Sequence, residues 1–176
     1  MQDNKLITVS NFIILVTILM YVFQTNMENG SLFLGLNVFF LEANLWYQPL
    51  SSMFAHGGVG HILMNMFVLF QFGNLIEKYR GVKTLLILYF IGGVLTSLLS
   101  FAFMQLMDFN HNLVGASGAL CVLLGYVALV DTYQRKGIIT WVVIISIAPV
   151  LIGLPVAWYA HLIGLAVGYF MGKFLR

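Results

Sequence analysis

Charged residues are scarce in this chain. Only 8% of its 176 residues are Asp, Glu, Lys or Arg, whereas soluble globular proteins carry about 25%. Too few polar side chains exist to cover a water-soluble surface, because 61% of the residues are hydrophobic. The composition therefore predicts a single integral membrane domain over residues 1–176, with the lipid bilayer as its surroundings.

Cysteines, buried acids and basic clusters are also few, and each scarcity excludes a class of protein. The single cysteine, Cys121, cannot form an intramolecular disulfide. No basic patch is present to suggest a nucleic-acid partner. The chain lacks the His-Glu-x-x-His motif of zinc proteases and has no pair of acids inside an apolar run, so we expect neither a metal nor a cofactor.

The apolar runs predict an all-α membrane protein with six transmembrane helices. No small-x-small cleavage site follows the first run, which therefore indicates a helix rather than a signal peptide. A span needs about 17–25 residues, so the last two runs are expected to form short helices. The runs cover residues 7–23, 59–76, 84–107, 115–130, 138–152 and 156–170.

The basic residues predict the orientation of these spans. With six spans, every lysine and arginine falls at a terminus or in the 2–3 or 4–5 loop, which share one side of the membrane. The opposite loops carry Glu28, Glu42 and Asp108. The positive-inside rule then places both termini in the cytoplasm. The basic residues are Lys5, Lys78, Arg80, Lys83, Arg135, Lys136, Lys173 and Arg176.

The connection between the first two spans, residues 24–58, is long for a loop. It is rich in leucine and phenylalanine, but Glu42, Asn44, Gln48 and Pro49 interrupt it. We therefore expect a structured element that lies in the outer membrane interface and does not span the bilayer.

Three of the predicted spans carry polar residues near their outer ends. Ser117 is the third residue of its run, His161 the sixth, and His61 and Asn65 the third and seventh of theirs. At 1.5 Å per residue, all four should lie about 3–10 Å below a helix start. A lone serine in a membrane helix is usually a packing residue, whereas a histidine there is costly and marks a functional site.

Ser117 and His161 are the candidate nucleophile and base of a hydrolase, because serine needs such a base for activation. Gly118 beside the serine, and Gly164 and Gly168 below the histidine, form small faces that let two helices approach closely. No acid is placed to orient His161. We therefore expect a Ser–His dyad whose imidazole is held by packing rather than by an aspartate.

His61 and Asn65 are four residues apart and so share one helical face. Both can donate hydrogen bonds, which with the backbone N–H of Ser117 makes them candidates for an oxyanion hole. His56 precedes the helix and is expected to brace the junction with residues 24–58. Cys121 lies one turn after Ser117 and is expected to pack, because an apolar site disfavours the thiolate.

Three motifs give this chain a resemblance to the rhomboid family of intramembrane serine proteases. The resemblance covers about residues 46–170 and is to the compact six-helix bacterial form. The motifs are His56-Gly-Gly-Val-Gly-His61-Ile-Leu-Met-Asn65, Gly115-Ala-Ser117-Gly118 and His161-Leu-Ile-Gly164-Leu-Ala-Val-Gly168.

The resemblance implies that Ser117 is the nucleophile, that His161 is the general base, and that His61, Asn65 and the Ser117 amide form the oxyanion hole. It implies single-span membrane proteins as substrates, cut in or near their transmembrane segment, and a location in the bacterial inner membrane. It also implies that the fifth helix, which carries Pro149, and the loop before the sixth helix gate the entry of substrate to the site.

Two positions depart from the family pattern. Tyr47-Gln48 stand where many members have Trp-Arg, and Cys121 stands where many have an aromatic residue stacked on the histidine, so His161 is expected to be held more loosely. Two alternatives stay open. One is a membrane acyl hydrolase that uses the same dyad, and the other is an inactive protein that binds transmembrane helices. The sequence names neither the substrate nor the oligomeric state.

Overall fold

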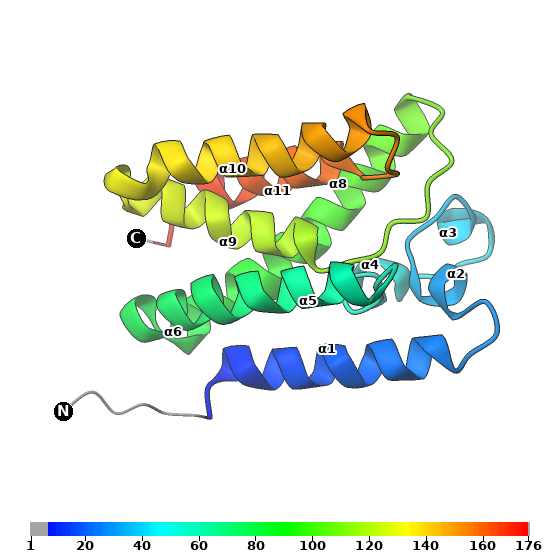
Figure 1. Ribbon diagram of the computed structural model, residues 1–176, viewed down its shortest axis with the longest axis horizontal. Helices are drawn as coiled ribbons and strands as arrows, with labels where there is room; N and C mark the ends of the chain where they lie inside the picture. Colours follow the sequence, from blue (N-terminus) through cyan, green and yellow to red (C-terminus); the bar gives the residue numbers. More distant parts are fainter. Residues whose placement is uncertain (1–6, 176) are drawn as a thin grey trace.

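The computed structural model describes residues 7–175, which form a bundle of helices. Figure 1 shows the helices running along the long dimension of the molecule, so that α1 begins and α11 ends at the same end. Six helical rods correspond to the six apolar runs and confirm the all-α class. They are α1 (Val9–Thr25), α5–η1–α6 (Val59–Val68, Leu69–Gly73, Asn74–Arg80), α7–η2–α8 (Val82–Leu86, Ile87–Gly92, Gly93–Leu106), α9 (Ser117–Val130), α10 (Thr132–Leu151) and α11 (Trp158–Met171).

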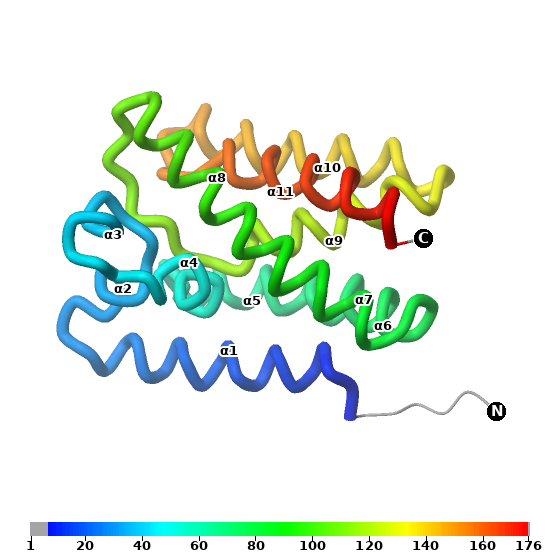
Figure 2. The backbone as a smooth tube through the Cα atoms, turned by 180° about the vertical axis from the view of Figure 1, so that it is seen from behind, coloured from blue at the N-terminus to red at the C-terminus, as the bar shows by residue number. Residues whose placement is uncertain are grey.

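Three of the rods are long and apolar enough to cross a membrane: Val59–Arg80, Val82–Leu106 and Thr132–Leu151. The helices α1, α9 and α11 are also apolar but shorter. Helix α9 lies at the centre of the bundle, in contact with α5, α8, α10 and α11 (Figure 2). Every residue of α9 from Ala119 to Leu129 is buried. A helix that is apolar on all sides fits this position because protein rather than lipid surrounds it.

Helix α10 is longer than the sequence predicted. We expected a short span over residues 138–152, but the helix begins at Thr132 and has 20 residues. The carboxylate of Asp131 accepts hydrogen bonds from the N–H groups of Tyr133 and Gln134 and so caps the helix start. Hydropathy alone missed the first turn and a half because it contains polar and charged residues that nevertheless continue the helix.

The carboxylate of Glu77, on α6, caps the start of α1. It accepts hydrogen bonds from the N–H of Val9 at 3.0 Å, the N–H of Ser10 at 2.9 Å and the hydroxyl of Ser10 at 3.1 Å. The hydroxyl of Thr8, the residue immediately before α1, accepts a hydrogen bond from the N–H of Asn11. The exposed donors of the first turn are thereby satisfied, and α1 is fastened to the second rod.

Residues 24–58 form a structured element, as predicted, with three short helices: α2 (Gly30–Leu34), α3 (Phe39–Glu42) and α4 (Gln48–Ser51). The side chain of Gln48 is fully buried. Its amide lies within 3.4 Å of the carbonyls of Leu32 and Phe33, and its oxygen accepts from the N–H of Asn37. Gln48 therefore joins α2 to α4 at the position where the Trp-Arg pattern is replaced by Tyr47-Gln48.

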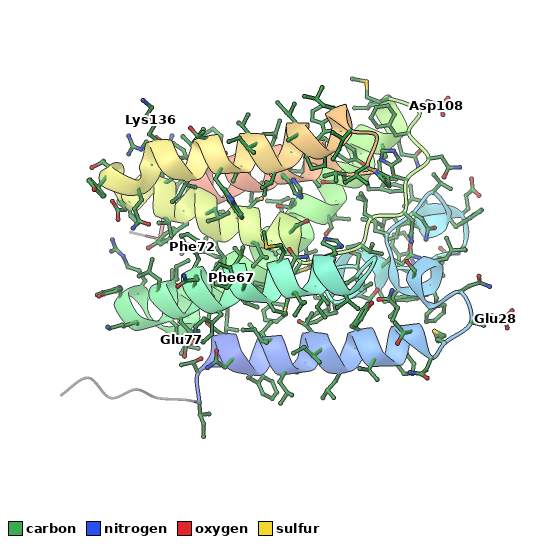
Figure 3. The ribbon with its side chains drawn as sticks, in the orientation of Figure 1. Glu28, Phe67, Phe72, Glu77, Asp108 and Lys136 are labelled. Atoms are coloured by element: carbon green, nitrogen blue, oxygen red, sulfur yellow. The ribbon has the colours of Figure 1, made fainter. Side chains whose placement is uncertain are left out.

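Charged side chains lie at both ends of the bundle. Lys136 and Glu77 lie at the end where α1 begins, whereas Glu28 and Asp108 lie at the end that carries residues 24–58 (Figure 3). Lys5 and Arg176, two of the residues behind the predicted orientation, lie outside the described part of the chain.

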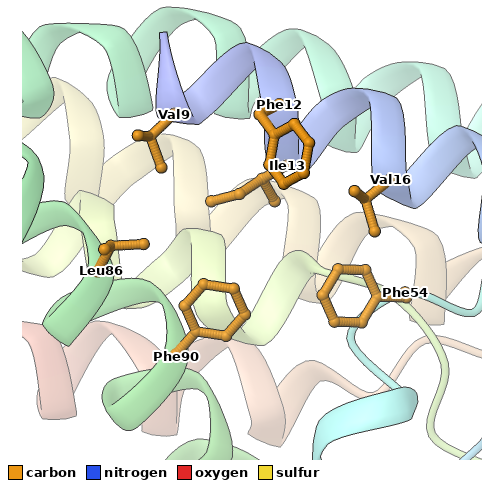
Figure 4. Close-up of a pocket in the computed structure, with 7 residues that line it drawn as sticks. All are labelled: Val9, Phe12, Ile13, Val16, Phe54, Leu86 and Phe90. Atoms are coloured by element: carbon orange, nitrogen blue, oxygen red, sulfur yellow. The ribbon is translucent and has the colours of Figure 1, made fainter.

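An apolar cavity of about 260 Å³ lies between α1 and the α7–η2 segment (Figure 4). It contains none of the polar residues of the candidate site, so it contributes no chemistry to that site. Its lining residues are Val9, Phe12, Ile13, Val16, Phe54, Leu86 and Phe90.

Candidate active site

The backbone of the loop before α9 is fastened to the residue 24–58 element at three points. Leu36 and Leu113 exchange two backbone hydrogen bonds, of 2.9 and 2.8 Å. The N–H of Gly115 donates to the carbonyl of Ser52 at 2.9 Å. The N–H of Ala116 donates to Nε2 of His56 at 3.5 Å. These bonds fix the backbone just before Ser117, which is the first residue of α9 and not the third as drawn from the sequence.

His56 connects this loop to the end of α1. Its N–H donates to the side-chain oxygen of Gln24 at 2.8 Å, and its carbonyl accepts from the Gln24 amide at 2.8 Å. Its Nδ1 lies 3.2 Å from the carbonyl of Phe54, so Nδ1 carries the proton and Nε2 is free to accept. Burial, with a smaller contribution from nearby His61, lowers the pKa of His56 to about 4.

Ser117 and His161 lie within hydrogen-bond distance of each other. Nε2 of His161 is 3.1 Å from Oγ of Ser117. Ser117 is half-buried, whereas His161, the fourth residue of α11, is buried. A serine hydroxyl and an imidazole in this arrangement can exchange a proton, which is the first requirement for a serine nucleophile.

Glycines bring α9 and α11 into backbone contact. A β-carbon on Gly164 would collide with the carbonyl oxygen of Gly118, and one on Gly168 would collide with the carbonyl oxygen of Val122. From the other side, a β-carbon on Gly125 would collide with the backbone of Leu165. The small faces predicted on both helices therefore face each other, and this close approach brings His161 to Ser117.

Ser146 of α10 holds the other nitrogen of the imidazole, which the sequence did not lead us to expect. Oγ of Ser146 lies 3.2 Å from Nδ1 of His161 and donates to the carbonyl of Val142 at 2.6 Å. The imidazole, which we expected to be held by packing rather than by an aspartate, therefore also has a hydrogen-bond partner, and that partner is a serine. The available signal was a lone serine in the outer half of the run 138–152, which we treated as part of an ordinary apolar helix.

His61 and Asn65 are the third and seventh residues of α5, as predicted, and lie beside Gly115, two residues before Ser117. A β-carbon on Gly115 would lie 2.8 Å from Nε2 of His61 and 3.6 Å from Nδ2 of Asn65. The N–H of Gly57 donates to Nδ1 of His61 at 3.4 Å, which leaves Nε2 to carry the proton. Nδ2 of Asn65 is buried and has no hydrogen-bond partner within residues 7–175.

Cys121 takes the place of the aromatic residue that many rhomboids carry. It is buried one turn below Ser117, and its β-carbon lies against the glycine face of α11. In the described range of the chain, no aromatic ring packs on His161. The hydrogen bond between His161 and Ser146 provides an alternative means of holding this imidazole. Across the same range, no group of three or more His, Cys, Asp or Glu side chains is arranged to hold a metal ion.

Most of the chain is similar to one family of known proteins. A family model described as the Rhomboid domain matches residues 43–176. RHOMBOID-like protein 4 of Arabidopsis thaliana is 35% identical over 134 residues, which are 72% of this chain and 33% of that protein. The mitochondrial RHOMBOID-like protein 6 of the same plant is 32% identical over 145 residues, which are 77% of this chain and 45% of that protein.

A bacterial relative, the rhomboid protease GluP of Bacillus subtilis, is 30% identical over 91 residues, which are 52% of this chain and 17% of that protein. The chain thus spans less than half the length of each of these three relatives. Fold and motifs together define an integral membrane protein built as a helical bundle. The chain belongs to the rhomboid family.

Proposed function

We propose that this protein is an intramembrane serine endopeptidase that cleaves single-span membrane proteins in or near their transmembrane segment. The observation that carries the proposal is the 3.1 Å approach of Nε2 of His161 to Oγ of Ser117. It is supported by the GluP relative, whose name describes it as a rhomboid protease. It is also supported by two hydrogen-bond donors, His61 and Asn65, which lie beside Gly115, two residues before the serine.

The proposed reaction proceeds by acyl transfer. His161 accepts the proton of the Ser117 hydroxyl while Oγ attacks the carbonyl carbon of the scissile peptide. The C–N bond then breaks, and His161 returns the proton to the leaving amine. A water molecule, deprotonated by His161, attacks the acyl-enzyme ester and releases the second product with Ser117 restored.

Three donors are proposed to stabilise the oxyanion that forms in this reaction: Nε2 of His61, Nδ2 of Asn65 and the backbone N–H of Ser117. The N–H groups in the first turn of a helix have no acceptor within that helix, so the Ser117 amide suits this role. The buried, unpartnered Nδ2 of Asn65 is the strongest support. A buried donor without an acceptor is costly unless a ligand or transition state supplies one. Each such donor contributes about 2.7–4 kcal/mol.

The proposed substrates must expose a peptide bond that a helix normally shields from attack. We therefore propose that local instability of the substrate helix selects the cleavage site as much as side-chain identity does. Helix-stabilising substitutions around the cut, such as glycine to alanine, should slow cleavage in proportion to their effect on helicity. An unchanged rate in a substrate whose helicity has measurably risen would contradict this proposal.

We propose that the protein resides in a bacterial inner membrane with both termini in the cytoplasm. This is supported by the basic residues of the described range, which lie at the ends of rods that meet where α1 begins. Alkaline phosphatase is active only outside the cytoplasm. A C-terminal fusion to it should therefore be inactive, whereas a fusion in the loop around Asp108 should be active. The reverse pattern would contradict the proposed orientation.

The function is tested by labelling the purified protein with a fluorophosphonate and by cleavage of a reconstituted single-span protein. Wild type should label and cleave, whereas Ser117→Ala and His161→Ala should do neither. Ser100→Ala is the matched control, because Ser100 is a buried serine on α8 whose hydroxyl has no partner among the described residues. It should behave as wild type.

The other outcomes identify the alternatives. Hydrolysis of lipid esters without peptide cleavage would indicate a membrane acyl hydrolase. Binding of the single-span protein by a folded wild type that neither labels nor cleaves would indicate an inactive helix-binding protein. In either case the proposed proteolysis would be overturned.

A further inference from the structure

Ser146 is a buried polar group that the dyad mechanism does not use. It lies in the outer half of α10, and its side chain is fully buried. Its oxygen contacts two groups, the carbonyl of Val142 on the same helix and Nδ1 of His161 on α11. It thus joins the helix that carries the candidate base to a helix that carries no other candidate catalytic group.

The proton on the Ser146 hydroxyl can go to only one of these two partners. The Val142 carbonyl has no proton to donate, so the short contact of 2.6 Å requires Ser146 to be the donor there. The Ser146 oxygen can then only accept from His161. Nδ1 of His161 must therefore carry a proton in the 3.2 Å contact.

This assignment fixes the tautomer of the candidate base. A neutral imidazole has one N–H, so a proton on Nδ1 leaves a lone pair on Nε2. Nε2 is the nitrogen that lies 3.1 Å from Ser117. The opposite tautomer would present an N–H to the serine and could not accept its proton, and in triad enzymes the wrong tautomer costs about four orders of magnitude in kcat.

We propose that Ser146 is a positioning residue, which holds His161 in the Nδ1–H tautomer and in the orientation that receives the proton of Ser117. The inference rests on the proposed serine-protease function, which it deepens. A continuous chain of hydrogen bonds results. It runs from the Ser117 hydroxyl to the imidazole, from the imidazole to the Ser146 hydroxyl, and from that hydroxyl to the Val142 carbonyl. Unlike the aspartate of a triad, Ser146 is uncharged. It sets tautomer and orientation but offers no full charge to the imidazolium.

The kinetic test compares Ser146→Ala with Ser146→Thr. Loss of the acceptor should lower kcat and the rate of fluorophosphonate labelling by roughly 10–100-fold, the range seen when an outer partner of a metal-binding histidine is removed. KM for a single-span substrate should change little, because Ser146 is buried behind the imidazole. Threonine keeps a hydroxyl that can bond the carbonyl four residues earlier, so Ser146→Thr should restore most of the rate. Ser100→Ala again serves as the control for loss of a buried serine hydroxyl.

The spectroscopic test does not depend on catalysis. Nitrogen-15 NMR of histidine-labelled protein distinguishes the two tautomers, and a His161→Gln sample identifies the His161 signals. Wild type and Ser100→Ala should show His161 as the Nδ1–H form. Ser146→Ala should show a mixture of tautomers or the Nε2–H form.

Three results would overturn the inference. They are an Nε2–H tautomer in wild type, an unchanged tautomer in Ser146→Ala, and a labelling rate in Ser146→Ala equal to that of the Ser100→Ala control. Failure of the proposed function has a different signature. In that case wild type itself does not label at Ser117, while the tautomer measurement still reports whether Ser146 orients His161.

Discussion

Gly115 and His61 approach so closely that a β-carbon on Gly115 would lie 2.6 Å from Cε1 of the imidazole. Gly115 also has a φ of +123°, a conformation that other L residues rarely adopt. Two independent constraints thus require glycine two residues before Ser117. One arises from the backbone of the loop and the other from the proposed oxyanion donor.

Gly115→Ala should therefore abolish activity, because the added methyl group displaces His61 or shifts the start of α9. Gly81→Ala is the matched control. Gly81 has a φ of +84°, but a β-carbon there would meet no atom within 4 Å. Backbone strain should cost each variant about 1–3 kcal/mol, and only Gly115→Ala should lose labelling at Ser117. Equal labelling in the two variants would show that contact with His61 is unimportant.

Gly168→Ala should separate α9 from α11, since its β-carbon would collide with the backbone of Val122. Overpacking of this kind costs about 1–3 kcal/mol, and a displacement of about 1 Å at the reacting atoms lowers rates roughly 100-fold. Gly137→Ala, in α10, provides the comparison because its β-carbon would point into open space. It should leave activity intact and raise stability by up to about 1 kcal/mol. Unfolding in detergent measures the change in stability, and the rate of substrate cleavage measures the change in activity.

Asn65→Ala should lower the activity of the protein without lowering its stability. Nδ2 of Asn65 has no partner among the described residues, so its removal breaks no hydrogen bond there. The melting temperature should stay the same or rise. The loss of one oxyanion donor should lower kcat roughly 10²–10³-fold. A variant that unfolds more easily and cleaves normally would instead assign Asn65 a purely structural role.

Acid should destabilise the protein through His56. The pKa of His56 falls from its ordinary 6.5 to about 4, because burial disfavours the charged ring and His61 adds a smaller effect. The folded state thus resists protonation that the unfolded state accepts. The contribution of neutral His56 to the free energy of unfolding is complete above pH 6.5 and is lost as the pH falls towards 4. Between pH 7.5 and pH 5, His56 alone should lower the free energy of unfolding by about 2 kcal/mol.

The measurement for His56 is the unfolding free energy in detergent across this pH range. His56→Gln should be less stable at pH 7.5 and should show a shallower loss towards pH 5. An identical slope in the two proteins would mean that other groups account for the acid sensitivity.

The helical rods and the residues at the core of the candidate site were predictable because their physical signals are local. Apolar runs give the rods, and the cost of burying a histidine singles out His161 in an otherwise apolar segment. The glycine spacing in α11 predicted the close contact with α9. The spacing of His61 and Asn65 placed both side chains on one face of α5.

The remaining features depend on tertiary contacts that no single segment reveals. Ser146 can be linked to His161 only once α10 is known to pack on α11, because a lone serine in a membrane helix is usually a packing residue. Gln48 is likewise an ordinary polar residue until α2 presents carbonyls to it. The start of α10 was misplaced because the capping contact of Asp131 outweighs the polarity of the first turn.

The burial of Cys121 makes the native chain a convenient background for spectroscopic probes. The only thiol of the protein is 1% exposed, so a maleimide spin label or fluorophore should leave it unmodified in the folded state. A cysteine introduced on α10 and another on α5 would then be the only labelled positions. Distances between these helices could be followed during substrate entry in a protein that needs no prior cysteine removal.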